Sequence, residues 1–153
     1  MGKKEMLQNG VKQVFYEEEW YPPISEALKN LTAAQACWQP EGKASNTIWE
    51  NANHLLTFKE RLLSRLHQDD TFVAPQNNDE YAWQQTVKRT LQVHDALQSS
   101  LTSLQEAELD QPSPSIPVWQ QYMNILLHDA YHTGQIIQLR KLQGSWPAHR
   151  SYL

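Results

Sequence analysis

The chain has 153 residues, with 17 acidic and 13 basic side chains and a single cysteine. The formal net charge of -4 provides no basic surface, so neither nucleic acid nor an anionic membrane is an expected partner. No apolar run approaches the roughly 18 residues of a membrane span. Cys37 cannot form an internal disulfide, and without a secretory signal we expect a cytoplasmic protein. This length predicts one domain, residues 1–153.

The first part of the chain follows a helical period. A helix is predicted from about Lys4 to Pro22, where two consecutive prolines must break or kink it. Pro23 is suited to the first position of a second piece that reaches about Leu31, before a short turn and a loop. One kinked helix and two separate pieces are both compatible with this pattern. The buried face of the first helix would contain Leu7, Val11, Val14 and Phe15.

The second long helix has a recognisable start. Thr47 and Glu50 fit a capping box, in which the two side chains satisfy backbone donors at the helix end. Such a cap is worth about 1 kcal/mol, and Ser45 or Asn46 could cap instead. His54 lies at the edge of the apolar stripe of this helix. The stripe consists of Ile48, Leu55, Phe58, Leu62 and Leu66.

A third helix is predicted after a polar segment, residues 67–79, that is long enough to cross the end of a bundle. The helix would run from about Asp79 to Leu104, and His94 falls on its apolar face. The other residues of that face are Trp83, Val87, Leu91, Leu97 and Leu101.

A fourth helix is predicted to open at Pro117, to continue to about Leu142 and to end at Gly144. The tail, residues 145–153, is expected to lie over the other helices. Four long helices with long second-to-third and third-to-fourth connections predict an all-α four-helix bundle.

Two histidines in the fourth helix indicate a metal site. His128 and His132 are four residues apart, so both imidazoles lie on one face and can reach the same point. Imidazole suits Zn, Ni, Fe and Cu, and a catalytic zinc-type site takes three protein ligands and leaves one position open. The third ligand could be a carboxylate, His54 or His94. We favour His54, because its border position suits the mouth of a pocket, whereas His94 lies on the centre of an apolar stripe. The bare pair is equally compatible with two core histidines that bond to the backbone or to Tyr131.

Three further residues carry weaker expectations. Asp129 points about 100° away from its neighbour His128, so it is expected at the surface or behind the metal ligands. Cys37 is expected to be a small buried hydrophobe rather than a nucleophile. Gln135, one turn after His132, could line the pocket or simply pack.

Three segments of the chain resemble the DinB-like superfamily. They are WQP at residues 38–40, TIWENANHL at residues 47–55 and HDAYHTGQI at residues 128–136. Proteins of that superfamily are metal-binding four-helix bundles of about this length. The resemblance implies an up-down-down-up topology and frequent homodimerisation.

The resemblance also implies which residues bind the metal. In the family pattern one histidine comes from the second helix and two come from the last, which match His54, His128 and His132. The residue directly after the final histidine is commonly arginine, and here it is Thr133. The implied cofactor is a divalent metal ion (Zn, Ni or Fe), with water in the open position.

Some members of the family resemble thiol-dependent transferases, which suggests an activity. These use the metal to activate a low-molecular-weight thiol such as bacillithiol, mycothiol or glutathione, and the thiolate attacks an electrophilic substrate. One alternative is a non-catalytic metal-binding or stress-response bundle, whose tryptophans could form a dimer face. Another is a metal-dependent hydrolase. A His-Glu-x-x-His peptidase is not expected, because Asp129 follows His128.

Overall fold

The prediction of an all-α protein is confirmed. The computed structural model describes residues 1–42, 44–67 and 79–148, and within these residues every regular element is a helix. None of the described helices is long and apolar enough to cross a membrane. The elements in chain order are α1 (Lys3–Phe15), α2 (Ile24–Leu28), α3 (Ala33–Ala36), α4 (Ile48–His67), α5 (Glu80–Ser103), the 3-10 helix η1 (Glu106–Asp110) and α6 (Val118–Leu142).

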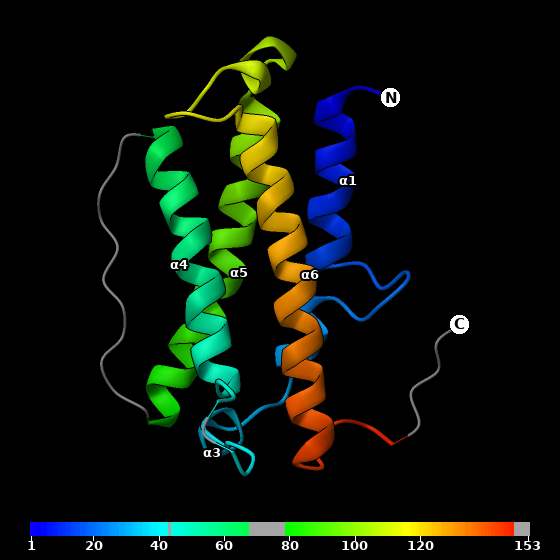
Figure 1. Cartoon of the computed structure of the whole chain (residues 1–153), viewed down its shortest axis with the longest axis vertical. Helices are drawn as coiled ribbons and strands as arrows, with labels where there is room; N and C mark the ends of the chain where they lie inside the picture. The colour runs from blue at the N-terminus through cyan, green and yellow to red at the C-terminus, as the bar shows by residue number, and fades with distance from the viewer. Residues whose placement is uncertain (43, 68–78, 149–153) are drawn as a thin grey trace.

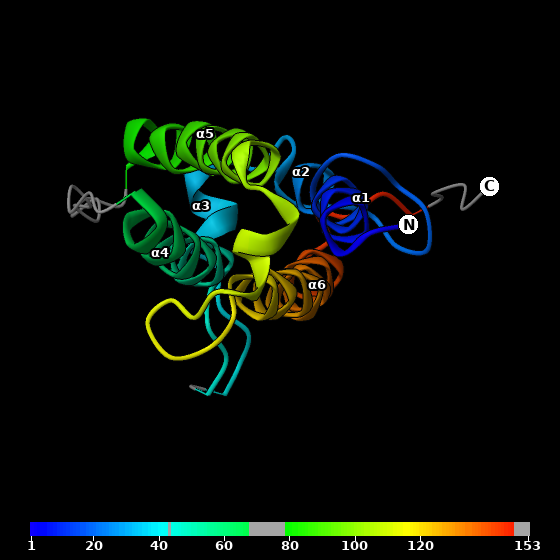
Figure 2. The same ribbon diagram turned by 90° about the horizontal axis from the view of Figure 1, so that it is seen from above.

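Four long helices, α1, α4, α5 and α6, form the bundle. Seen from above, α4 lies beside α5 and α6, while α1 lies beside α5 and α6 on the other side (Figure 2). In Figure 1, α1 and α6 run from top to bottom, whereas α4 and α5 run from bottom to top. The short helix α3 lies at the lower end of the bundle (Figure 1), and the short helix α2 contacts α6 and α1. Consequently α4 and α6 lie antiparallel and in contact, which brings their residues face to face.

The helix starts follow the predicted local signals. At the start of α4, the Glu50 amide donates to Thr47 Oγ1 at 3.1 Å, and the Thr47 amide donates to a Glu50 carboxylate oxygen at 2.7 Å. This reciprocal pair confirms the predicted capping box. The Asp79 side chain caps α5 by accepting from the Ala82 amide.

The last helix, α6, begins after Pro117 and ends before Gly144, as the sequence predicts. Pro117 precedes α6 in the N-cap position, and Gly144 follows its end with a φ of 78°. Only glycine adopts this left-handed conformation at little cost, so Gly144 stops the helix.

The predicted first helix and the predicted turn after it need correction. The helix α1 ends at Phe15, well before Pro22, and α2 begins only at Ile24, so the two are separate pieces. Glutamates at residues 17–19 follow α1 immediately, and negative charge at the negative end of a helix dipole disfavours further helix. The expected turn contains α3, which Thr32 and Gln35 start with a second capping box.

Two apolar clusters fill the bundle, one near each end. Helices α1 and α6 approach closely at Gly10, where a Cβ atom would stand only 2.5 Å from Leu126 Cδ1. Two residues predicted on buried stripes are exposed instead, namely Phe58 (38%) and Leu91 (44%). The apolar stripe of α4 is therefore narrower than expected, and Phe58 lies at its edge.

Part of the predicted tail packs on the bundle. Trp146 contacts the lower cluster, and the Arg140 guanidinium lies 5.0 Å from the centre of its ring. The Arg140 guanidinium also donates to the carbonyl oxygen of Ser145. The rest of the tail, residues 149–153, lies outside the described residues. So do residues 68–78, which make up most of the segment 67–79 that the sequence predicted to cross the bundle end.

Candidate metal centre

Three histidines from two facing helices lie side by side. His128 and His132 occupy successive turns of α6, and His54 faces them from α4. One ring nitrogen from each lies within 4.8 Å of the other two, and the Nε2 atoms of His54 and His128 are 2.9 Å apart. His132 is buried, His128 is half-buried and His54 is exposed. The cluster therefore opens to solvent on the His54 side.

Asn51 fixes the orientation of the His132 ring. The Asn51 side-chain nitrogen donates to the carbonyl oxygen of Thr47 at 2.9 Å, which leaves Asn51 Oδ1 as the acceptor. His132 Nδ1 lies 2.8 Å from this oxygen and therefore carries the proton. The lone pair of His132 is then on Nε2. A metal-ligating histidine usually donates the N–H of its other ring nitrogen to an acceptor, which fixes the ring. Here the acceptor is Asn51, and its orientation depends in turn on Thr47, the residue that caps α4.

The ionisation of the cluster suits a metal. Burial, followed by the neighbouring His132 and His54, lowers the pKa of His128 to about 4. Burial, followed by His54, also lowers the pKa of His132, while a hydrogen bond with Gln135 acts in the opposite direction. Both rings are thus neutral at pH 7 and offer lone pairs. Three neutral imidazoles form a known ligand set of catalytic zinc sites, so these residues fit a divalent metal ion.

Comparison with known families supports the same assignment. A family model described as the DinB superfamily matches residues 21–136, which is most of the chain and includes all three histidines. This chain belongs to the DinB superfamily. Neither a curated protein nor a solved structure was found to match it. The family-level resemblance seen in the sequence is confirmed.

In this DinB-superfamily chain, His94 and Cys37 lie apart from the three histidines. His94 is buried on α5, as expected for a core histidine, and its ring stacks on Phe15 with 3.5 Å between the centroids. Cys37 is exposed, which contradicts the expected buried position. Partial removal of the Cys37 thiol from water, followed by the nearby Glu50 carboxylate, still raises the pKa of this thiol. The thiol is therefore protonated at neutral pH, which makes it a poor nucleophile.

Asp129 was expected at the surface or behind the ligands, and the structure places it in the core instead. Its carboxylate is fully buried and lies 2.7 Å from the equally buried Lys59 ammonium of α4. His94 Nε2 lies 3.2 Å from the other carboxylate oxygen. The ammonium and the His94 ring hold the pKa of Asp129 below its usual value although burial opposes this. These three side chains, the Lys59–Asp129–His94 network, join α4, α5 and α6.

Lys59 was not predicted as a buried residue, although a signal was present in the sequence. Lys59 stands four residues after Leu55 and three before Leu62, and both of these leucines are buried. A lysine at this spacing lies on the apolar stripe of its helix. A buried ammonium requires a carboxylate partner, and Asp129 on the facing helix provides it.

The His94 ring should make the protein sensitive to acid. Burial, followed by the nearby Lys59 ammonium, lowers the pKa of His94 to about 4, against about 6.5 in an unfolded chain. Between these two values the unfolded chain binds the extra proton, so stability falls as the pH falls. We expect the metal-free protein to lose about 3 kcal/mol from this group alone between pH 6.5 and pH 4. Urea unfolding at several pH values measures the loss.

The His94→Gln variant is the matched control for this acid sensitivity. It removes the titrating ring and leaves Asp129 paired with Lys59, so its stability should depend less steeply on pH in the same window. Its metal content should equal that of the wild type, because His94 lies outside the histidine cluster. Equal slopes for the two proteins would contradict the assignment of the acid sensitivity to His94.

Two cavities lie on either side of the histidine cluster along the α4–α6 interface. The apolar cavity, of about 300 Å³, has His128 in its wall. Its other lining residues are Phe58, Leu62, Arg65, Ile116, Gln121, Asn124 and Ile125.

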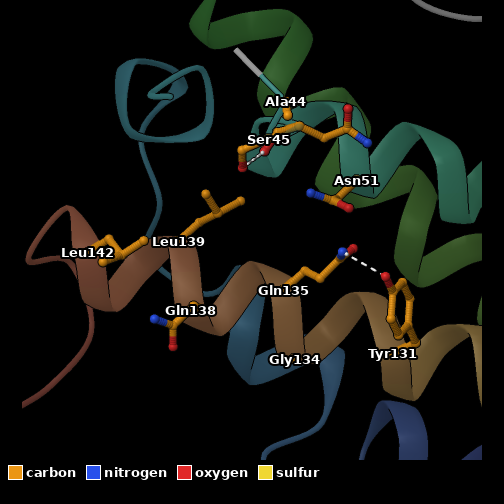
Figure 3. Close-up of a pocket in the computed structure, with 10 residues that line it drawn as sticks. Ala44, Ser45, Asn51, Tyr131, Gly134, Gln135, Gln138, Leu139 and Leu142 are labelled. Atoms are coloured by element: carbon orange, nitrogen blue, oxygen red, sulfur yellow. Dashed lines mark hydrogen bonds between the residues drawn. The ribbon is translucent and has the colours of Figure 1, made fainter. Parts of the chain in front are cut away.

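The polar cavity, of about 420 Å³, lies on the His132 side (Figure 3). Asn51 and Tyr131, which both contact His132, belong to its wall. Its other lining residues are Ala44, Ser45, Asn46, Gly134, Gln135, Gln138, Leu139 and Leu142. The candidate centre thus has separate space for a polar and an apolar group.

Proposed function

We propose that this protein is a metal-dependent thiol S-transferase, in which a divalent metal on His54, His128 and His132 activates a low-molecular-weight thiol for attack on an electrophile. The observation that carries the proposal is the convergence of three imidazoles at a site with one solvent-open side and a cavity on each flank. The resemblance to thiol-dependent members of the family supports the choice of a thiol.

The chemistry of the proposed reaction follows from charge. When bound, a divalent cation lowers the pKa of an adjacent thiol. The thiol proton leaves to solvent on the exposed His54 side. The sulfur electron pair forms the new carbon–sulfur bond, and the leaving group of the electrophile departs with the electrons of the bond that breaks. The chain supplies neutral imidazoles and room for two reactants, with the apolar cavity beside His128 suited to an apolar electrophile.

The surroundings of the site give less support to hydrolysis. A metal-dependent hydrolase commonly uses a carboxylate or an imidazole as a general base beside the metal. Asp129, next to His128 in the chain, is fully buried and paired with Lys59, so it is not available for this role. Among the described residues, the cluster that could hold a metal contains histidines alone.

A cobalt-substituted protein tests the proposal. Addition of 2-mercaptoethanol should produce a near-ultraviolet sulfur-to-cobalt absorption band, and monochlorobimane should then be consumed faster than with metal-free protein. The His128→Ala/His132→Ala double variant should show neither effect. A protein that binds cobalt stoichiometrically but shows no band and no added consumption would favour the non-catalytic metal-binding bundle.

A further inference from the structure

The apolar cavity beside His128 follows the interface of α4 and α6 and ends at an arginine. Its α4 wall consists of Phe58, Leu62 and Arg65, whose spacing of four and three residues places them on one strip of the helix. Phe58 and Arg65 are separated by about 10 Å along the helix axis, as the rise per residue requires. The cavity is therefore elongated.

The α6 wall shows which end of the cavity is next to the histidine cluster. It covers a similar length, from Gln121 to His128. Because α4 and α6 are antiparallel, the two walls run in opposite directions (Figure 1). The Phe58 ring lies 4.9 Å from the His128 ring, measured between centroids. Arg65 therefore lies at the opposite end, beside the start of α6.

Arg65 gives this far end a positive charge. It is the only charged side chain among the described lining residues. Its Nε donates to the carbonyl oxygen of Arg61 at 3.1 Å, and no carboxylate of the described residues forms an ion pair with it. The positive end of the α6 dipole lies at the same end of the cavity, because α6 begins at Val118. The two terminal nitrogens of the guanidinium suit an anion.

Between the two ends the cavity is apolar. Leu62 and Ile125 are buried side chains of its wall, and Ile116 of the loop before α6 completes it. Gln121 holds this loop, since its side-chain nitrogen donates to the carbonyl oxygen of Ser113. Such a wall favours a hydrophobic body and penalises a charge. A bound molecule can therefore place a negative charge only at the Arg65 end.

We propose that this cavity binds the electrophile, and that the electrophile is an apolar molecule with one anionic group, such as a carboxylate. Its reactive carbon lies next to His128 and its anionic group lies at Arg65. The inference rests on the proposed function for the reaction at the metal, whereas the binding requires neither thiol nor turnover. Arg65 is a specificity-determining residue, because it distinguishes an anionic electrophile from a neutral one of the same shape.

Nuclear magnetic resonance titration of the zinc-loaded protein without thiol tests the binding. The probes are 4-chlorobenzoate and its neutral counterpart 4-chlorobenzamide, which have the same ring and nearly the same size. We expect saturable shifts of the Arg65 Nε–H and of the Asn124 side-chain amide. The Kd of the benzoate should be about fivefold lower than that of the benzamide, because an ion pair in contact with solvent accounts for a factor of this size. High salt should reduce the difference.

Three variants locate the anionic group. Arg65→Gln removes the charge and keeps a good helix former, so it should bind the two probes equally. Arg65→Lys should keep most of the preference for the benzoate. Arg61→Gln is the matched control, because it removes the same charge one turn away at a residue outside the described lining, and it should keep the wild-type Kd values. All three should fold and retain their metal, since both arginines are exposed.

Turnover is measured with 4-chloro-3-nitrobenzoate and 4-chloro-3-nitrobenzamide, with 2-mercaptoethanol as the thiol. The sulfur forms a bond to the ring carbon, chloride leaves with the electrons of the carbon–chlorine bond, and the thiol proton passes to solvent. Each kcat/KM is divided by the rate constant of the uncatalysed reaction. We expect this ratio to favour the benzoate about fivefold in the wild type and to show no preference in Arg65→Gln.

The outcomes separate this inference from the proposed function. Equal Kd values for the two probes in the wild type, or a preference lost in Arg61→Gln, would overturn the inference. A preference that persists in Arg65→Gln would also overturn it, since the carboxylate would then lie at the zinc ion. Binding with the expected preference but without turnover would refute the transferase and leave the cavity assignment standing. Turnover that does not distinguish the two electrophiles would do the reverse.

Discussion

Purified without chelator, the protein is expected to contain about one divalent metal ion per chain, and His132→Ala is expected to lose it. The variant removes one of three converging nitrogens, the one that Asn51 holds in place. Replacing only a residue that supports a ligand typically costs 10- to 100-fold in affinity, so loss of the ligand itself should cost at least about 100-fold. His54→Ala should behave in the same way. Inductively coupled plasma mass spectrometry and chelator competition measure the effect.

The control for metal loss is a histidine elsewhere on the same helix as His54. His67 is exposed at the end of α4 and lies outside the cluster, so His67→Ala should keep one metal per chain. Circular dichroism should show unchanged helix content in all variants, because the bundle has apolar clusters of its own. One metal per chain in either His132→Ala or His54→Ala would refute the three-histidine site.

Local signals in the sequence predicted the frame of this site well. Thr47 and Glu50 mark the start of α4 through hydrogen bonds between residues three apart, and Pro117 and Gly144 mark the two ends of α6 through their own backbone conformations. Such interactions depend little on the rest of the fold. The same holds for His128 and His132, whose spacing alone places them on one face of a helix.

Features that depend on tertiary contacts were harder to predict. Whether His54 or His94 joins the pair depends on which face of α4 and α5 turns toward α6. The position of His54 at the border of its apolar stripe favoured His54, but residue spacing alone could not show which faces meet. The family resemblance favoured His54, and the structure places His54 beside His128. The predicted position of Asp129 was wrong because the helical period shows only the direction in which a side chain points. It does not show which residue of another helix lies in that direction. Only the packing of α4 on α6 shows that this direction leads to Lys59.

The buried ion pair gives the second large expected effect, on stability. Lys59→Met should destabilise the metal-free protein by about 3–5 kcal/mol at pH 7, because it leaves the Asp129 carboxylate without its ammonium partner in a fully buried position. His94 offsets little of this loss at pH 7, since a neutral ring supplies only a hydrogen bond. Urea unfolding at constant pH measures the change.

A double variant separates the cost of the unpaired charge from the value of the pair. Lys59→Met/Asp129→Leu removes both charges and fills their space with apolar atoms, and replacements of this kind are often neutral or stabilising. We therefore expect its stability to lie within about 1 kcal/mol of the wild type or above it. Lys88→Met, at an exposed position on α5, should change stability by less than about 0.5 kcal/mol.

The metal content of the double variant then shows what the ion pair contributes to the site. Lys59 and Asp129 join the same two helices as the histidine cluster, and Asp129 directly follows His128 in the chain. If apolar contacts alone set the approach of α4 to α6, the double variant should bind metal as the wild type does. A stable double variant with weakened metal affinity would instead show that the pair fixes the rotation of α6 that aims His128 and His132 at His54. A single variant as stable as the wild type would contradict the burial of an ionised Asp129.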